Sequence, residues 1–299
     1  MNHKRTHETE LVSLREPISR REALGGILTT LGGALLLACG GSAVAAATDG
    51  GTGDAGGGGG DGGASDDARS AADGALDRTA AGEWASGGTA SMTGNYPDPF
   101  PTALASCVLA TAATEGPCTE SNDRERRDIS EGYTGLPVRL ALRVVDASCN
   151  PIGGAKVKVW HTQITGSYSG DTPNPNMCLK TSAEQQKHYF RGVQTTDAAG
   201  RVDFDTCFPG WYRGRTIHIH FTVTVGGKSF TSQLVFEQSL ISEIFSSHPE
   251  YKGYGQPDTP NATDNVVGNQ NLATFTLETS RMADGAMLAA KNLVVPLSA

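Results

Sequence analysis

The chain has 299 residues, a formal net charge of −8 and 38 glycines, which is about 13% glycine against a usual share near 7%. The glycines lack a three-residue period, which excludes collagen, and apolar runs such as 138–145 exclude a wholly disordered chain. The acidic balance argues against nucleic acid as a partner. Because 17 of the glycines fall within residues 40–95, we expect a disordered linker there and one folded domain over 96–299.

Residues 1–38 have the features of an export signal. An uncharged run over 23–38 is too short for a membrane span, which needs about 20 apolar residues. Ser19-Arg20-Arg21 before it is similar to a twin-arginine signal, and Leu36-Leu37-Ala38-Cys39 resembles a bacterial lipobox. We therefore expect an exported protein whose Cys39 carries a lipid anchor, in the periplasm or at the cell surface. The alternative is a free cysteine beside an ordinary cleavage site.

From residue 96 onward, short runs of alternating apolar and polar residues are separated by turn residues. This pattern predicts an all-β domain with a β-sandwich fold. The clearest strand is 217–225, where five apolar residues alternate with His218, His220 and two threonines. One short helix is expected over 240–245. The expected strands are 138–144, 155–159, 201–204, 217–225, 230–236, 273–277 and 293–297.

A set of nitrogen and oxygen donors gathers around the 217–225 strand. The two-residue period of a strand places His218 and His220 on one side, where two imidazoles can converge on one metal ion. An isolated His-x-His pair is more often two polar residues on the outer face of a strand than a metal site. Tyr212 and Arg215 stand in the turn that leads into this strand, and Tyr168 follows another turn. Two phenols and two imidazoles suit ferric iron better than zinc or copper(I).

Several motifs, in the same order, resemble those of the intradiol ring-cleavage dioxygenases, the family of the catechol and protocatechuate dioxygenases. They are Glu115-Gly116-Pro117, Arg127-Asp128-Ile129, 160–169, Arg191-Gly192, Thr196-Asp197, 209–212 and 215–220. The resemblance spans about 114–236 and implies a prealbumin-like β-sandwich. Because the N-terminal region is a signal and a linker rather than a helical dimerisation domain, the chain is most similar to the exported, single-domain members.

The resemblance also implies a site and a reaction. The ligands of a non-haem Fe(III) would be Tyr168, Tyr212, His218 and His220. Arg215 would be a cation that stabilises negative charge, Tyr212 would take a substrate proton, and Gln233 would line the pocket. The partners would be a small aromatic diol and O2, with the ring opened between the two hydroxylated carbons to a muconate-type product.

The sequence departs from the family pattern in one place. Cys118-Thr119 follows Gly116-Pro117, where family members commonly have aromatic residues, often a tyrosine that contacts substrate. The identity of the diol is therefore open, and an iron-binding homologue with altered activity is one alternative. The other is a non-catalytic β-sandwich binding module, which has no need of the ordered tyrosines and histidines. The sequence does not predict the oligomeric state.

In an exported chain, disulfides are expected among the five cysteines of the domain. These are Cys107, Cys118, Cys149, Cys178 and Cys207. Their pairing stays open, although proximity to turns favours Cys107 with Cys118 and Cys178 with Cys207, leaving Cys149 free. A cysteine-based metal site is disfavoured because no Cys-x-x-Cys spacing occurs. The histidines expected near the surface or around the site, rather than as ligands, are His161, His188 and His248.

Overall fold

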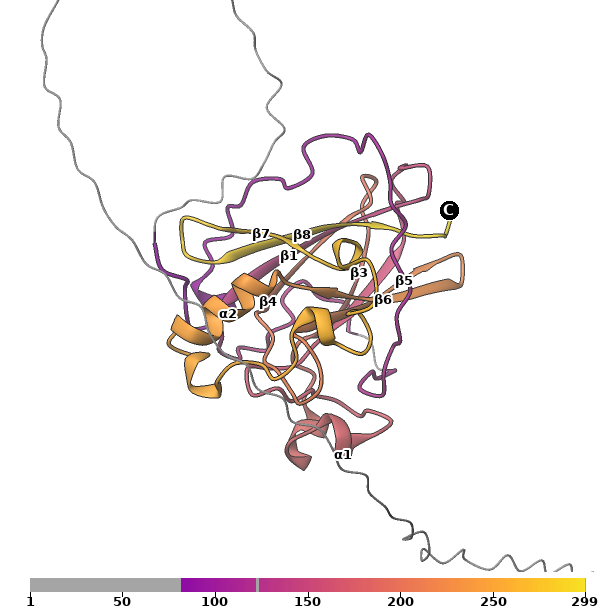
Figure 1. The fold of residues 1–299 in the computed structure, drawn as a ribbon. Helices are drawn as coiled ribbons and strands as arrows, with labels where there is room; N and C mark the ends of the chain where they lie inside the picture. The colour runs from indigo at the N-terminus through magenta and orange to yellow at the C-terminus, as the bar shows by residue number, and fades with distance from the viewer. Residues whose placement is uncertain (1–81, 122–123, 299) are drawn as a thin grey trace, which may run out of the picture. The chain divides into compact units, whose positions relative to one another are not determined.

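The computed structural model describes residues 82–121 and 124–298, which contain two four-stranded sheets packed face to face (Figure 1). One sheet has the strand order β4-β1-β8-β7, and the other has the order β3-β2-β5-β6. The strands are β1 (Pro137–Val145), β2 (Lys156–Trp160), β3 (Arg191–Thr195), β4 (Arg201–Cys207), β5 (His218–Val225), β6 (Lys228–Val235), β7 (Glu278–Arg281) and β8 (Met287–Val294). The all-β sandwich expected from the sequence is confirmed.

Helices are few and lie in the connections. The α-helices are α1 (Pro175–Cys178) and α2 (Gln238–Ser247), and the 3-10 helices are η1 (Thr89–Ser91), η2 (Ser182–Gln186), η3 (Lys252–Tyr254), η4 (Asn261–Thr263) and η5 (Leu272–Thr274). The expected helix over 240–245 is confirmed as α2. Within the described ranges, no helix is both long and apolar enough to cross a membrane. The loops around α1 extend from one end of the sandwich (Figure 1).

The core lies between the sheets and follows the alternation of the strands. The even-numbered residues 138–144 of β1, the odd-numbered residues 219–225 of β5 and Ile217 just before β5 belong to one buried cluster. Arg139 and Arg143 point to the other face of β1 and are nevertheless only 5% and 9% exposed. Each guanidinium lies 4.9 Å from an aromatic ring centroid, that of Tyr96 or Phe100 respectively, so the segment around 96–100 covers this face.

Residues 82–95, which we expected to belong to the linker, lie against the domain. The Trp84 ring packs on the core cluster, its Nε1–H donates to Glu243 at 2.8 Å, and the Arg281 guanidinium lies 4.2 Å from its centroid. Gly88 N–H donates to the carbonyl of Gly135 at 2.8 Å. The packed domain therefore includes this segment. The expected signal over 1–38, Cys39 and the linker up to residue 81 lie outside the described residues.

Two of the expected strands are misplaced. Residues 273–277 do not form a strand: η5 occupies their start, and β7 begins only at Glu278. The Asn271 side chain accepts a hydrogen bond from the Ala273 N–H and so stabilises the first turn of η5. The last strand, β8, begins at Met287 rather than at 293. Strand β3 was not expected, because Val193 is the single large apolar side chain within 191–195 and no alternation is visible there.

The disulfides also differ from the pairing that turn proximity favoured. Cys107 bonds to Cys149 and Cys118 bonds to Cys178, while Cys207 is a buried free thiol at the end of β4. Proximity to turns failed because the partners are joined by folding across 42 and 60 residues rather than by closeness in the chain. In the chain-entropy model, closing loops of these sizes stabilises the fold by about 4 kcal/mol each.

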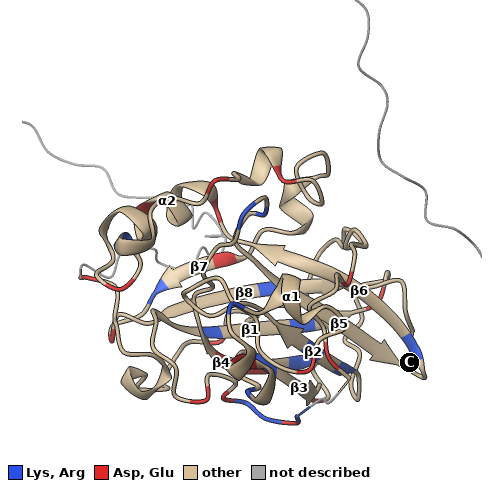
Figure 2. Cartoon of the chain, turned by 90° about the horizontal axis from the view of Figure 1, so that it is seen from below, with Lys and Arg blue, Asp and Glu red and all other residues tan. Residues whose placement is uncertain are grey.

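Charged residues of opposite sign are interspersed over the side of the domain seen in Figure 2. Several form local pairs: Arg127 and Arg139 both contact Asp205, and Arg201 contacts Asp203. The more exposed of these pairs contribute little to stability, because water screens them.

Candidate metal centre

The candidate site lies on the outer face of the β3-β2-β5-β6 sheet. Ile219 and Phe221 of β5 face the core, so His218 and His220 face the opposite side. The strand register pairs His220 with Trp160 of β2 and with Gln233 of β6. Residues directly opposite one another on antiparallel strands share a face. These three side chains therefore form a row across the sheet.

The two tyrosines come from loops that meet over this face. Tyr168 lies in the loop after β2, and Tyr212 lies in the connection from β4 to β5. The loops contact each other through their backbones: Gly210 N–H donates to the carbonyl of Gln163 at 3.2 Å, and a Cβ on Gly166 would collide with the carbonyl of Trp211. Glycine is needed where two backbones approach this closely.

Four donor atoms converge at the site. The hydroxyl oxygens of Tyr168 and Tyr212 and the Nε2 atom of His220 each lie 3.2 Å from Nε2 of His218. The Nδ1–H of His218 donates to the carbonyl of Thr216 at 2.6 Å, which leaves a lone pair on Nε2. The sequence predicted that these four residues would form one site, and the structure brings them together.

Burial favours the neutral forms of the two imidazoles and the two phenols. It lowers the pKa of His218 to about 3, helped by the nearby charge of Arg215, and it lowers the pKa of His220 well below its usual value. Burial and the neighbouring Tyr212 raise the pKa of the Tyr168 phenol far above its usual range. Burial also raises the pKa of Tyr212, although the charge of Arg215 opposes that shift. Both imidazoles thus present lone pairs rather than charges.

The donor set fits a ferric ion better than it fits protein hydrogen bonding alone. The lone pair on Nε2 of His218 faces three polar atoms, the two phenol oxygens and Nε2 of His220. Nδ1 of His220 is buried and has no hydrogen-bond partner among the described residues. Within residues 82–121 and 124–298, no group of three or more His, Cys, Asp and Glu side chains could hold a metal ion. A metal ion at this site would therefore depend on the two phenols, which are hard donors suited to Fe(III).

Arg215 and Gln233 form the polar side of the site. The Arg215 Nε–H donates to Asp264 at 2.9 Å, and its Nη2–H donates to the Gln233 carbonyl oxygen at 2.6 Å. The Gln233 amide donates in turn to the carbonyl of Thr114 at 3.0 Å. The Arg215 side chain is only 13% exposed and the Asp264 side chain is fully buried. The guanidinium is consequently fixed in direction.

Two residues of the site were not predicted. Trp160 stacks on His220 with ring centroids 4.8 Å apart and planes 7° apart, which orients the imidazole. Asp264 anchors Arg215 and also accepts the N–H of Thr216 at 2.8 Å. The alternation of 155–159, in which the odd-numbered residues face the core, could have placed Trp160 on the outer face. No sequence signal marks Asp264, because it lies in an irregular connection far along the chain.

The other histidines are not part of the donor set. His161 is 1% exposed, and its ring bonds to the Thr206 hydroxyl at 2.7 Å and the Thr162 carbonyl at 2.8 Å, so it is buried close to the site rather than at the surface. The ring of His188 pairs with Glu120 at 2.9 Å. His248 is also buried and contacts the Ala85 carbonyl at 2.9 Å.

Comparison with known proteins agrees with this arrangement. The family model described as Dioxygenase matches residues 112–251. The chain is 30% identical to a solved dioxygenase over 64% of this chain and 96% of that one, with a TM-score of 0.57. The chain belongs to the intradiol ring-cleavage dioxygenase family. An intradiol ring-cleavage dioxygenase of Tetranychus urticae is also similar, with 29% identity, the same coverages and the same TM-score.

An intradiol ring-cleavage dioxygenase of Aspergillus niger is 26% identical over 146 residues. That match covers 41% of this chain and 44% of the fungal enzyme, so the chain spans less than half the length of this curated relative. Every predicted site residue of the intradiol dioxygenase domain lies inside the matched segment 112–251, whereas Asp264 lies beyond its end.

Proposed function

We propose that the chain is a non-haem Fe(III) intradiol dioxygenase that opens a catechol-type aromatic diol between its two hydroxylated carbons. The observation that carries the proposal is the convergence of Tyr168, Tyr212 and His220 on Nε2 of His218, each at 3.2 Å. Family membership supports the same reaction class. The diol itself supplies the electrons that reduce O2, and both oxygen atoms enter the muconate-type product.

Ferric iron bound by these four side chains would supply Lewis acidity toward the diol hydroxyls and would accept electron density from the aromatic ring. The protein contributes to the reaction first by burying the donor side chains. Tyr168, His218 and His220 are 2–3% exposed, so the inner part of the site is closed to bulk water. A dry site strengthens every charge interaction within it.

The two phenols have different surroundings, which supports different roles. The charge of Arg215 favours the ionised form of both phenols, although burial outweighs it and raises the pKa of each. Tyr168 is buried, whereas Tyr212 is half-buried. The Tyr212 hydroxyl oxygen is therefore the one placed to exchange with solvent and substrate. Once ionised, it can accept a proton from an incoming diol.

Arg215 is the residue suited to stabilise negative charge that develops on the substrate. Asp264 and Gln233 hold its guanidinium from two sides, so little reorganisation is needed when the charge appears. Gln233 is in turn fixed by Thr114. Cys118 occupies a position where family members commonly have an aromatic residue, so the substrate contacts there differ from the family pattern.

The absorption spectrum of the iron-loaded chain tests this function. Tyrosinate bound to Fe(III) gives a visible charge-transfer band, so the loaded protein should be coloured and should bind one iron per chain. The double variant Tyr168→Phe with His220→Ala should lose both the colour and the iron. A colourless wild-type protein with iron bound, or unchanged iron content in the double variant, would leave the non-catalytic binding module as the better description.

We further propose that the protein is exported and anchored through a lipid on Cys39. Two disulfides within the domain support export, since disulfides persist mainly in oxidising compartments. Mass spectrometry of the N-terminal peptide from the membrane fraction should find a lipidated Cys39, and Cys39→Ser should move the chain to the soluble fraction. An unlipidated Cys39 in a soluble chain would contradict the anchor.

A further inference from the structure

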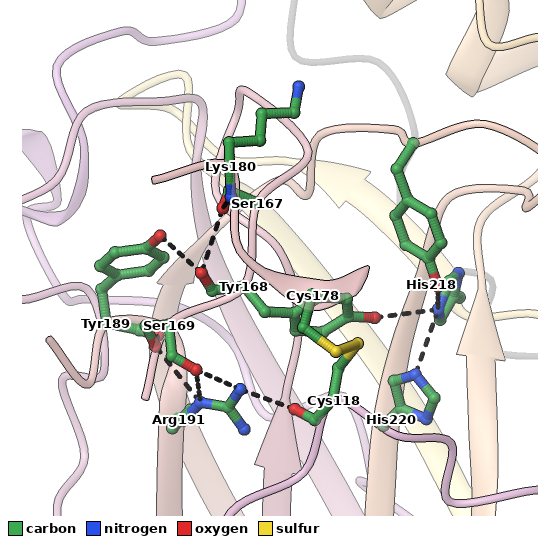
Figure 3. The surroundings of a disulfide bond; sticks show 11 residues. Cys118, Ser167, Tyr168, Ser169, Cys178, Lys180, Tyr189, Arg191, His218 and His220 are labelled. Atoms are coloured by element: carbon green, nitrogen blue, oxygen red, sulfur yellow. Dashed lines mark hydrogen bonds between the residues drawn. A yellow bond between two sulfur atoms is a disulfide. The ribbon is translucent and has the colours of Figure 1, made fainter. Parts of the chain in front are cut away.

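The Cys118–Cys178 disulfide lies directly beside the candidate metal centre (Figure 3). Cys118 follows the 114–117 loop, and Cys178 is the last residue of α1. Both are buried, at 7% and 3% exposure, in one cluster with Trp160 and Tyr168. The sulfur bridge is thus part of the packing that surrounds the Tyr168 ring.

Cys178 is hydrogen-bonded directly to the backbone of Tyr168, and Cys118 is linked to the neighbouring Ser169 through the Arg191 side chain. The Tyr168 N–H donates to the carbonyl of Cys178 at 2.9 Å. The carbonyl of Cys118 accepts a hydrogen bond from Nη2 of Arg191 at 2.6 Å, and Nε of the same guanidinium donates to the carbonyl of Ser169 at 2.8 Å. Figure 3 shows the contacts of Arg191 with Cys118 and Ser169. Tyr168 is therefore held between two segments that the disulfide ties together.

The loop that Cys118 anchors reaches the rest of the site. A Cβ on Gly116 would lie 3.5 Å from Cε1 of His220, so the loop passes over that imidazole. The carbonyl of Thr114 accepts the Gln233 amide at 3.0 Å. One end of the loop thus contacts the imidazole and amide side chains, and its other end is fastened beside the phenol.

The second disulfide has a different setting. Cys107 and Cys149 are half-buried, and the bridge joins the segment before the 114–117 loop to the turn between β1 and β2. Neither cysteine belongs to the cluster around Tyr168. The two bridges close loops of comparable size, 42 and 60 residues, so they should constrain the unfolded chain similarly. The Cys107–Cys149 disulfide is therefore a suitable control for experiments on Cys118–Cys178.

We propose that the Cys118–Cys178 disulfide is a positioning element for Tyr168: it fastens the 114–118 loop to the Tyr168 segment and so holds the phenol at its place opposite His218. The part of this inference that concerns iron rests on the proposed function. The part that concerns the placement of Tyr168 does not.

The first experiment compares two double variants of the full chain, C118S/C178S and C107S/C149S. Both should unfold at lower temperature than the wild type. After iron loading, C118S/C178S should bind iron at least tenfold more weakly and show a weakened or shifted charge-transfer band, whereas C107S/C149S should match the wild type in both. An unchanged band and affinity in C118S/C178S, or equal losses in the two variants, would overturn the proposal.

A second, metal-free measurement decides the matter if C118S/C178S does not fold or if the wild type binds no iron. In the C107S/C149S chain, a reductant can open only Cys118–Cys178. Amide hydrogen exchange in the segment containing Tyr168 should accelerate at least tenfold on reduction, while β5 stays protected. Exchange in that segment that changes less than twofold, or that accelerates together with β5, would overturn the positioning role. A wild-type chain without the iron band would instead contradict the proposed function alone.

Discussion

Gly166 packs so closely against the backbone carbonyl of Trp211 that no side chain fits between them. This contact joins the loop of Tyr168 to the loop of Tyr212, and it brings the two phenols to one point. Gly166 also has a φ of +79°, which other residues adopt only with strain.

Gly166→Ala should therefore destabilise the domain and separate the two tyrosines. Gly154→Ala is the matched control, because Gly154 has a φ of +76° but open space around its Cβ position. We expect Gly154→Ala to lower the free energy of unfolding by about 1 kcal/mol and Gly166→Ala by about 2–4 kcal/mol, since only the latter adds a collision. Denaturant unfolding measures both. Equal losses would show that the loop contact does not contribute.

Removing either phenol should affect iron binding differently. Tyr168 is buried, so in Tyr168→Phe no water can replace the lost oxygen and the iron content should fall sharply. Tyr212 is half-buried, so in Tyr212→Phe water can occupy the vacant position. That variant should retain most of its iron but bind the diol more slowly, because the proton acceptor is missing. Metal analysis and stopped-flow mixing with catechol test the two outcomes, and the reverse order of iron loss would contradict the assigned roles.

Arg215→Lys should reduce turnover while leaving the iron site in place. Lysine keeps the charge but cannot contact Asp264 and Gln233 at once in the planar arrangement of a guanidinium. We expect kcat to fall about a hundredfold with the absorption band unchanged. Arg213→Lys, at an exposed position two residues away, is the control and should behave as the wild type. Comparable kcat values for the two variants would argue against a role for Arg215 in the reaction.

Asp264 should make the stability of the domain depend on pH. Burial raises its pKa, but the hydrogen bonds from Thr216 and Arg215 and the charge of Arg215 outweigh burial, and the pKa is lowered overall. A lowered pKa in the folded state adds stability above the unfolded value of about 4, and this stability is lost as the pH falls through the folded-state pKa. Asp264→Asn should thus cost about 1–3 kcal/mol at neutral pH and progressively less in acid.

The exposed Asp258, which accepts the N–H of Gly214 at 3.0 Å, provides the control for this measurement. Asp258→Asn should change the free energy of unfolding by less than about 0.5 kcal/mol, because water replaces the lost contact. A pH-independent difference between Asp264→Asn and the wild type would contradict the linkage.

Local alternation was sufficient to predict the central part of the fold and the two histidines of the donor set, and the resemblance to the family implied the two tyrosines. The alternation around His218 and His220 identifies β5 and its outward face, and Tyr168, Tyr212 and Arg215 lie in turns with distinct sequence patterns. Contacts between distant segments were not predictable in this way. Asp264 reaches Arg215 from a loop without a repeating pattern, and the partners of Cys118 and Cys149 depend on how loops fold over the sheets.

The start of the domain illustrates the same limit. Glycine content placed the linker's end near residue 95, yet Trp84 lies against Glu243 and Arg281, both far along the chain. A single aromatic residue in a glycine-rich segment carries little local signal, and its packing depends on a surface formed by later elements.

The fate of labelled oxygen tests the proposed function most directly. The iron-loaded chain is mixed with catechol, protocatechuate or hydroxyquinol under 18O2, and the products are analysed by mass spectrometry. The four converging donors and the family of the chain predict that at least one diol gives a muconate-type diacid with both labelled atoms in the same molecule. A ring opened beside rather than between the hydroxylated carbons, incorporation of one labelled atom from O2, or no product from any of the three diols would contradict it.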